Sequence, residues 1–230
     1  MESRSLTIAD FAESPDSVHH FFGTRHGHGT PSLGDVTVVS VRQVHGTDTL
    51  IVDRPVQPGE QFSGQWDALV TNQPRVLLTI RTADCVPVLI HDLDRKVVAA
   101  IHAGWRGAVA QILRKTIEVL RRRFGSDPAS LRIGIGPSAG PCCYEVDEPV
   151  LTHLRTSYPQ WRQVARETGA NKALLDLRGL IRGQSEAEGV PAGHVHTISL
   201  CTICNPELFY SYRREGVVNA TMVSGIMLLP

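Results

Sequence analysis

The strongest constraint on the fold is the spacing of short apolar runs, which recur along most of the chain between turn residues. Runs rich in Val, Ile and Leu favour strands, because branched side chains fit a pleated sheet. The predicted strands are Val36–Val44, Leu50–Val52, Ala68–Val70, Val76–Ile80, Val86–His91, Val97–His102, Leu131–Ile135, Val195–Leu200, Phe209–Arg213 and Ala220–Leu229. Helical spacing is found only in Ala108–Phe124, Val146–Tyr158 and Leu174–Glu188. This mixture predicts an α+β fold, a single mixed α/β domain.

Length and composition agree with one domain spanning residues 1–230. A chain of 230 residues, of which 42% are hydrophobic, buries enough surface to fold without disulfides or a metal. The turn-rich segments Gly23–Gly34, Arg54–Gln65 and Ser138–Cys142 are too short to separate independent domains.

Charge and hydropathy argue against two classes of partner. Lys+Arg and Asp+Glu are both 23, whereas proteins that bind nucleic acid normally carry a basic excess. No apolar run approaches the about 18 residues that a membrane-spanning helix needs. The N-terminal residues also lack the apolar centre of a secretion signal. We therefore expect a soluble cytoplasmic protein without nucleic-acid or membrane partners.

The five cysteines are an odd number and two of them are adjacent, which favours thiols for metal binding or catalysis over disulfides. Cys201 and Cys204 form a C-x-x-C pair without a second such pair, so we expect buried structural thiols there. Cys142 and Cys143 follow Gly-Pro at a turn, where they either fill a small packing site or lie near a pocket.

Two His-x-His pairs, His26 with His28 and His194 with His196, have a pattern that multicopper oxidases use. Blue copper sites also place His and Cys close together in sequence, and no cysteine here has a histidine neighbour. We therefore expect these four residues to be ordinary loop or strand histidines.

Cys85 and His102 are expected to meet at one edge of a sheet. One predicted strand starts just after Cys85, and the next ends at His102, with the turn Asp92–Lys96 between them. Antiparallel pairing would place the start of the first strand beside the end of the second. Such a pair is either a nucleophile with its base or two metal ligands.

His45 is a third candidate, because it ends a predicted strand and precedes a glycine. A His, Cys and His set leaves one position of a tetrahedral zinc ion open, which is typical of catalytic zinc. The spacing alone does not decide between this metal site and three ordinary turn residues.

Several segments together resemble the laccase-domain family, also called multicopper polyphenol oxidase-like or purine nucleoside phosphorylase-like. They run in order from Phe21 to Gly216, about five-sixths of the chain: FFGTRHG, RQVHG, WDALVTN, TADCVPVLI, AAIHAGWRG, IGPSAGPCCYEV, LDLRGLI and CTICNPELFYSYRREG.

The resemblance implies a deamidase-like fold, as in cytotoxic necrotizing factor, and one zinc ion bound by His45, Cys85 and His102. It also implies phosphorolysis of adenosine, inosine and methylthioadenosine, and hydrolytic deamination of adenosine. The implied partners are small purine nucleosides and phosphate. The oxidase label of the family implies copper and phenolic substrates.

Residues near the predicted centre have candidate roles in these reactions. Cys85, His102 and Asp84 are the candidate catalytic residues; Asp84 can move a proton only if the chain turns beside Cys85. Phosphate needs cations around it, and the arginines within the matching motifs are Arg25, Arg42, Arg106 and Arg213.

Two other functions stay open at this stage. One is a copper-dependent polyphenol oxidase, or laccase. The other is a cysteine hydrolase of amides in cell-wall precursors, with Cys85 as nucleophile and a histidine as base.

Overall fold

Two adjacent strands are buried along their whole length, which places them at the centre of the molecule. In the computed structural model, which describes residues 5–11, 17–29, 36–57, 59–217 and 219–230, these are β7 (Val86–Asp92) and β8 (Val97–Ala103). A strand buried on both faces must be covered on both sides. They belong to a six-stranded sheet of order β13 (Val195–Thr197), β9 (Arg132–Ile135), β7, β8, β5 (Ala68–Thr71) and β4 (Thr49–Val52).

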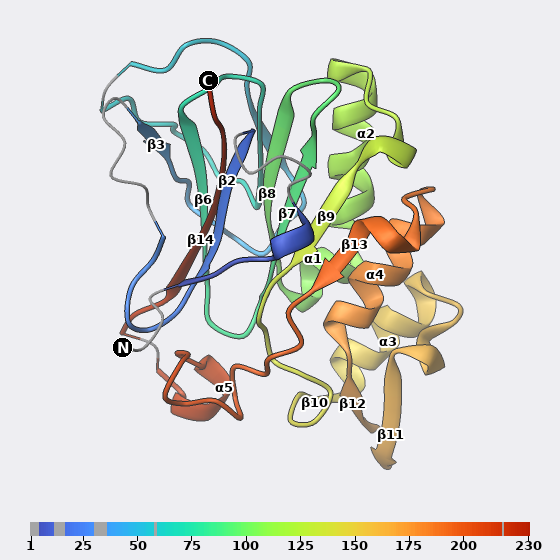
Figure 1. Ribbon diagram of the computed structural model, residues 1–230. Coiled ribbons are helices and arrows are strands. Elements are labelled where there is room, and N and C mark those ends of the chain that lie inside the picture. The colour runs from blue at the N-terminus through green and yellow to red at the C-terminus, as the bar shows by residue number, and fades with distance from the viewer. Residues whose placement is uncertain (1–4, 12–16, 30–35, 58, 218) are drawn as a thin grey trace.

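A second sheet covers one face of the first (Figure 1). Its order is β1 (Ser5–Leu6), β2 (Val18–Gly23), β14 (Met222–Leu228), β6 (Val76–Thr82) and β3 (Thr37–Val39). Leu89 and Ala100 of the six-stranded sheet join Leu78 and Ile226 of the second sheet in one buried cluster. Alternate residues of β7 and β8 therefore face this inter-sheet core.

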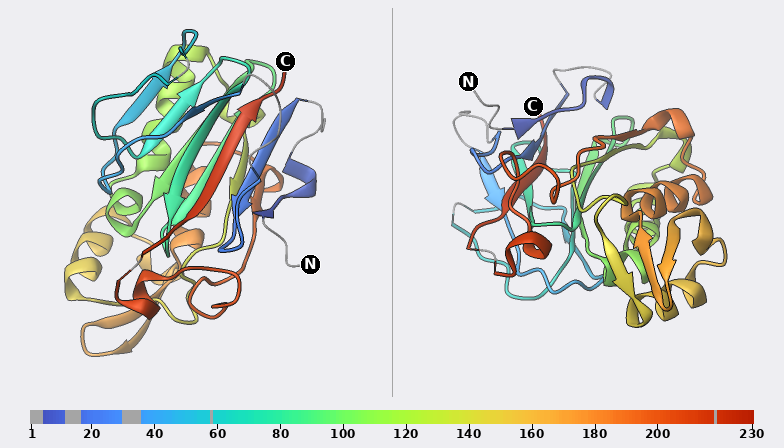
Figure 2. Two further views of the ribbon diagram at one scale, coloured as in Figure 1. Left: turned by 90° about the vertical axis from the view of Figure 1, so that its left-hand side faces the viewer. Right: turned by 90° about the horizontal axis from the view of Figure 1, so that it is seen from below.

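Helices cover the opposite face, so that the chain forms three layers (Figure 2). The layer contains α2 (Ile112–Phe124) and α4 (Leu177–Ala187). Ile90 and Ile101 of the central strands share a buried cluster with Ile117 and Ile181 of these helices. The short α1 (Trp105–Val109) follows β8 directly, and Gly104 is its N-terminal cap.

A smaller unit lies beside one end of the layers (Figure 1). It contains the antiparallel sheet β10 (Glu145–Asp147), β12 (Lys172–Leu175) and β11 (Ala165–Gly169) together with α3 (Glu148–Ser157). The remaining described helical elements are α5 (Tyr212–Glu215) and the 3-10 turns η1 (Ala9–Phe11), η2 (Pro128–Ser130), η3 (Trp161–Gln163) and η4 (Ala192–His194).

The prediction that the Cys85 and His102 strands pair antiparallel is confirmed: Val86 lies opposite Ala103, and Pro87 lies opposite His102. The predicted helix Ala108–Phe124 is wrong in its first turn, because Gln111 has a φ of 63° and separates α1 from α2. A left-handed residue interrupts the helical hydrogen-bond ladder.

Other predicted boundaries also differ from the structure. The strand predicted over Phe209–Arg213 is absent; α5 begins at its end, where Ser211 caps Arg214 N. The helix predicted from Leu174 begins at Leu177, because Asp176 accepts a hydrogen bond from Gly179 N and caps it. The residues before that cap pair instead in β12. Within the described residues, no helix is both long and apolar enough to cross a membrane.

Candidate metal and active site

Three side chains from distant parts of the sequence meet at one end of the central strands. His45 lies in the loop after β3, Cys85 in the turn between β6 and β7, and His102 near the end of β8. Their ligand atoms all lie within 4.8 Å of one another. The rings of His45 and His102 meet edge to face with centroids 4.8 Å apart. The antiparallel pairing of β7 with β8 supplies two of these three side chains.

The loop that carries His45 is held in place by a buried carboxylate. Asp67, which precedes β5, is 1% exposed. Its Oδ1 accepts a hydrogen bond from His45 N (2.9 Å), and its Oδ2 accepts from Val44 N (3.2 Å) and Gly46 N (2.6 Å). His45 has a φ of 61°, a left-handed conformation that is costly for a residue with a Cβ. The carboxylate thus stabilises a strained turn that presents His45.

The same carboxylate also orients His102. His102 Nδ1 donates to Asp67 Oδ1 at 2.7 Å, which leaves Nε2 of the ring as the atom that can bind a metal. Sequence reasoning missed Asp67 as a functional residue. The signal was present, because Asp67 lies in the WDALVTN segment, but a role for it requires knowing that Asp67 lies beside His102.

Electrostatics favour a thiolate at this centre. Burial alone would raise the pKa of Cys85, but hydrogen bonds with His102 and His45 outweigh it and lower the pKa to about 7. Burial would lower the pKa of His102, but Asp67 and Cys85 raise it to about 9. Burial alone would raise the pKa of Asp67, but the hydrogen bonds from His102, Gly46 N and Val44 N outweigh it and lower the pKa.

The residues present fit a metal ion. One thiolate sulfur and two imidazole nitrogens are the donor set that suits zinc, and copper accepts the same ligands. Gly104 leaves the space they need: a Cβ there would lie 2.7 Å from the His45 ring and 3.1 Å from Cys85 Sγ. The absence of a side chain at position 104 therefore keeps the ligand cluster open.

The cluster lies in the wall of a cleft of about 720 Å³. This volume suits a small organic molecule. Arg42, Arg106 and Arg213 line the cleft, and so does Arg81, which the sequence analysis did not single out. The aromatic lining residues are Trp105, Tyr144 and Tyr212. The arginines supply positive charge, and the rings offer flat apolar surfaces.

Asp84 lines the cleft too, but its carboxylate is engaged on the protein side. The chain does turn there, with a φ of 83°. Oδ1 accepts from Thr202 Oγ1 (2.6 Å), and Oδ2 accepts from Ser211 Oγ (3.0 Å) and Arg213 N (2.7 Å). Asp84 therefore ties the turn that carries Cys85 to the C-terminal wall of the cleft.

The family model of the multi-copper polyphenol oxidoreductase laccase matches residues 25–229. The chain belongs to this family. A purine nucleoside phosphorylase from Bacteroides thetaiotaomicron is 35% identical to this chain over 206 residues, which are 87% of this chain and 76% of that protein. A protein named adenosine deaminase, from an unknown prokaryotic organism, is 32% identical over 195 residues, 82% of this chain and 74% of that protein. The crystal structure of YlmD from Geobacillus stearothermophilus superposes with a TM-score of 0.83 at 28% identity and covers 94% of each chain.

One arginine predicted for the substrate site of this laccase-domain protein lies elsewhere. Arg25 is exposed and is not among the residues that line the cleft. Its guanidinium donates to Pro206 O and lies 4.8 Å from the centre of the Tyr210 ring. These contacts join the turn after β2 to the segment before α5.

Two further predictions concern histidines and cysteines outside the cleft. His26, His28, His194 and His196 take no part in the two possible metal-binding clusters found among the described residues, and their assignment as ordinary loop or strand histidines stays a prediction. The expectation that Cys201 and Cys204 are simply buried thiols is wrong, because Cys204 is exposed and both residues meet Cys142 and Cys143. These four cysteines come from two segments that lie far apart in the sequence, so local sequence patterns did not predict that they meet.

Proposed function

We propose that this protein is a zinc-dependent enzyme of purine nucleosides. It would cleave adenosine, inosine and methylthioadenosine with phosphate, and would also deaminate adenosine with water. The observation that carries the proposal is the meeting of His45, Cys85 and His102 in the wall of a cleft. The printed names of the relatives, purine nucleoside phosphorylase and adenosine deaminase, support the same reaction classes.

The cleft has groups for both halves of such a substrate. Trp105 and Tyr144 line the cleft, where their rings can contact a purine base. Arg106 lies over the Trp105 ring, 4.5 Å from its centre, so a positive charge is next to this apolar lining. Arg42 and Arg106 are exposed within the cleft and can bind phosphate oxygens through charge-assisted hydrogen bonds.

His45, Cys85 and His102 would hold the zinc ion. When bound in such a set, zinc supplies Lewis acidity and lowers the pKa of water toward neutrality. Asp67 keeps His102 in the ligating tautomer through the Nδ1 hydrogen bond. Asp84, whose oxygens accept three hydrogen bonds from the protein, would act as a positioning residue rather than as the proton carrier.

A cysteine hydrolase is the second candidate, because the pKa of Cys85 is about 7 and His102 is its neighbour. A copper-dependent polyphenol oxidase is a third, since the matching family model carries that description.

One set of assays separates the three. Purified protein is incubated with adenosine, with and without phosphate, and the products are separated by chromatography. The proposal expects adenine and ribose phosphate with phosphate present, and inosine in both reactions. A chelator and Cys85→Ala should each abolish both reactions, and Cys85→Ala should lose one equivalent of zinc per chain.

The outcomes that contradict the proposal are equally distinct. Hydrolytic activity that survives the chelator but is lost on treatment with a thiol alkylator would indicate the cysteine hydrolase. Bound copper, with oxidation of a phenol and no purine product, would indicate the oxidase.

A further inference from the structure

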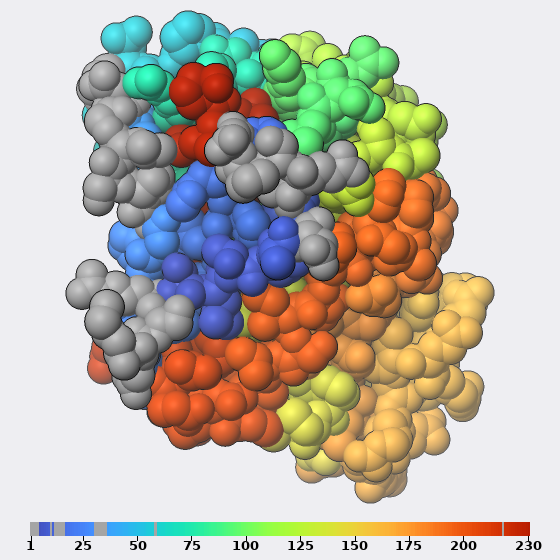
Figure 3. All heavy atoms as spheres, viewed as in Figure 1, coloured from blue at the N-terminus to red at the C-terminus, as the bar shows by residue number. Residues whose placement is uncertain are grey.

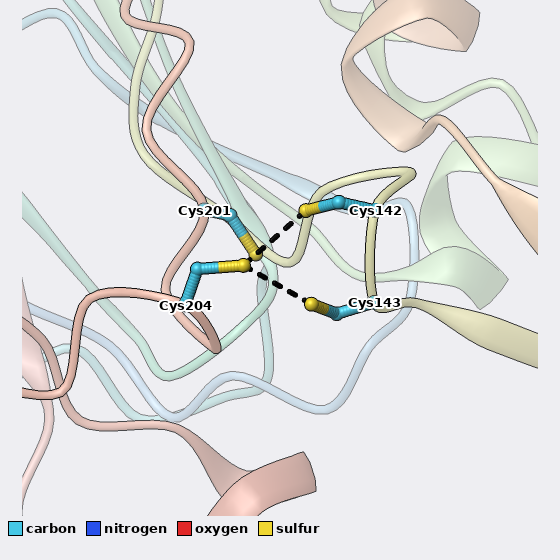
Figure 4. Close-up of side chains that lie close together, drawn as sticks. All are labelled: Cys142, Cys143, Cys201 and Cys204. Atoms are coloured by element: carbon cyan, nitrogen blue, oxygen red, sulfur yellow. Dashed lines mark hydrogen bonds between the residues drawn. The ribbon is translucent and has the colours of Figure 1, made fainter.

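Four cysteines from two distant segments meet outside the proposed active site. Cys142 and Cys143 lie in the turn between β9 and β10, and Cys201 and Cys204 lie in the segment after β13. All four sulfurs lie within 4.8 Å of one another. Cys204 Sγ is 3.4 Å from Cys142 Sγ and 3.1 Å from Cys143 Sγ. Figure 4 shows the four side chains pointing toward one another.

The fold brings these segments together through its sheet. β13 pairs parallel to β9, and an isolated bridge continues the pairing from Ser138 to Cys201. The segments meet at the surface: in Figure 3 the yellow-green atoms of the chain around residue 140 border the orange-red atoms around residue 200. Cys142 and Cys204 are exposed there, whereas Cys201 is buried. A metal ion from solution can therefore reach the cluster.

Backbone amides point at the innermost sulfur. Gly140 N donates to Cys201 Sγ at 3.3 Å. The N–H groups of Cys204 and Ile203 also donate to this sulfur. Two of these donors lie in the C-x-x-C turn itself, so the turn wraps its own first sulfur. Such N–H groups pointing at a ligand are a common feature around metal-bound sulfur.

Two guanidinium groups flank the cluster. Arg178 is 8% exposed and donates to Ile198 O (3.3 Å) and Leu200 O (2.7 Å), just before Cys201. None of the ion pairs found among the described residues involves it. Arg214 donates to Thr202 O (2.7 Å) and Ile203 O (3.1 Å), inside the C-x-x-C turn. A buried cation without a carboxylate is costly unless negative charge lies nearby.

The position of Gly140 shows how close this charge is to the sulfurs. A Cβ at Gly140 would lie 2.9 Å from Arg178 Nη2 and 3.4 Å from Cys142 Sγ. The guanidinium and the sulfur therefore face the same point. Four thiolates around a divalent cation leave a net charge of about −2, which Arg178 is placed to offset in part, whereas Arg214 is already paired with Glu215.

We propose that Cys142, Cys143, Cys201 and Cys204 bind a structural zinc ion. A tetrahedral ion with Zn–S bonds of about 2.3 Å separates its sulfurs by about 3.8 Å, within the spread seen here. The four thiols release four protons in total as Zn²⁺ binds, and no electron is transferred. All four positions are filled by protein, so this ion has no place for water or substrate.

The ion would join two segments that support one wall of the cleft. Tyr144 follows Cys143 directly and lines the cleft. Thr202 lies between Cys201 and Cys204 and donates to Asp84, beside Cys85. The zinc site would therefore hold the wall in place without taking part in the reaction. This proposal does not depend on the proposed function.

The test measures zinc by mass spectrometry in full-length protein purified under reducing conditions. Wild type should hold one equivalent more than Cys204→Ser, whatever the active site binds. With the proposed active-site ion also bound, wild type holds two equivalents, Cys204→Ser one, and the matched control Cys85→Ala one. The double variant Cys85→Ala/Cys204→Ser should hold none. With Co²⁺ in place of zinc, the ion kept by Cys85→Ala should show strong thiolate charge-transfer absorption, and the ion kept by Cys204→Ser should show much less.

A second measurement avoids reliance on variants that fold poorly. Chelation of Cys85→Ala, which keeps only the four-cysteine site, should lower Tm by roughly 5 °C or more, and Zn²⁺ but not Mg²⁺ should restore it. Equal zinc content in wild type and Cys204→Ser would overturn the proposal. So would a metal-free protein whose intact mass, two units lower for each pair, shows disulfides among these cysteines. Iron in the site would overturn the assignment to zinc.

Discussion

Asp67→Asn tests whether one carboxylate sets both the His45 loop and the tautomer of His102. In the native site Oδ1 accepts from His102 Nδ1 and His45 N, and Oδ2 accepts from Val44 N and Gly46 N. Asparagine has the same shape but one acceptor oxygen, so its NH₂ group must face donors on one side. The substitution therefore removes acceptors without opening a cavity.

Either orientation of the new amide has a defined cost. If NH₂ faces Val44 and Gly46, two backbone donors lose their acceptor, which lowers the free energy of unfolding by about 2–6 kcal/mol. If NH₂ faces His102, it donates to Nδ1 and moves the ring proton to Nε2. That tautomer cannot ligate through Nε2, and losses of this kind weaken metal binding by about 10–100-fold.

The assay combines zinc competition against a chromogenic chelator with unfolding in urea. The affinity of the His45, Cys85 and His102 site is isolated by comparison with the same variant carrying Cys85→Ala. Asp53→Asn is the matched control, because Asp53 is 41% exposed and pairs with Arg123 at the surface. It should change stability by no more than about 1 kcal/mol. Wild-type zinc affinity together with a wild-type urea midpoint in Asp67→Asn would refute the reasoning.

Three further outcomes are expected. Arg106→Met should slow phosphorolysis by about 10- to 150-fold more than deamination, because only phosphorolysis uses phosphate. The control Arg25→Met should change neither rate. Equal losses of both reactions in Arg106→Met would contradict a phosphate role. Gly104→Ala should weaken zinc binding, because the added methyl group meets the His45 and Cys85 side chains. The control Gly193→Ala should not, because nothing lies within 4 Å of a Cβ there. Equal zinc affinities of the two variants, measured by chelator competition, would count against the steric argument. Burial, with two neighbouring histidines, lowers the pKa of His20 to about 4, below its ordinary 6.5. The free energy of unfolding should therefore be highest above pH 6.5 and should fall by up to about 3 kcal/mol as the pH drops to 4, because the unfolded chain binds the proton more tightly. His20→Gln should reduce this dependence of the free energy of unfolding on pH in urea titrations.

The sequence predicted those parts of the site that depend on local order. Cys85 and His102 end neighbouring strands joined by a short turn, so their meeting follows from one antiparallel pair. Asp67 was not predictable in this way, because its role depends on β5 lying beside β8. The four-cysteine cluster depends on the parallel pairing of β13 with β9, which joins segments about sixty residues apart. The deamidase-like fold stays a prediction from resemblance.

Local patterns also failed where a single backbone conformation decides the element. The apolar spacing runs through Gln111 without a break, yet a φ of 63° there starts a new helix. Apolar spacing alone cannot separate β12 from α4 either. The boundary depends on Asp176, whose carboxylate accepts a hydrogen bond from Gly179 N. Such conformations are set by tertiary packing and capping, which periodicity does not record.

The place of β14 in its sheet affects how the protein is made in the cell. β14 lies between β2 and β6, although β2 is about 200 residues earlier in the chain. Ribosomes add about 5–20 residues per second, so β2 waits about 10–40 s for its neighbour. Once each is made, β2 and β6 present an unpaired edge until β14 arrives, and such edges can pair with other chains. The five-stranded sheet therefore closes only after β14 has emerged.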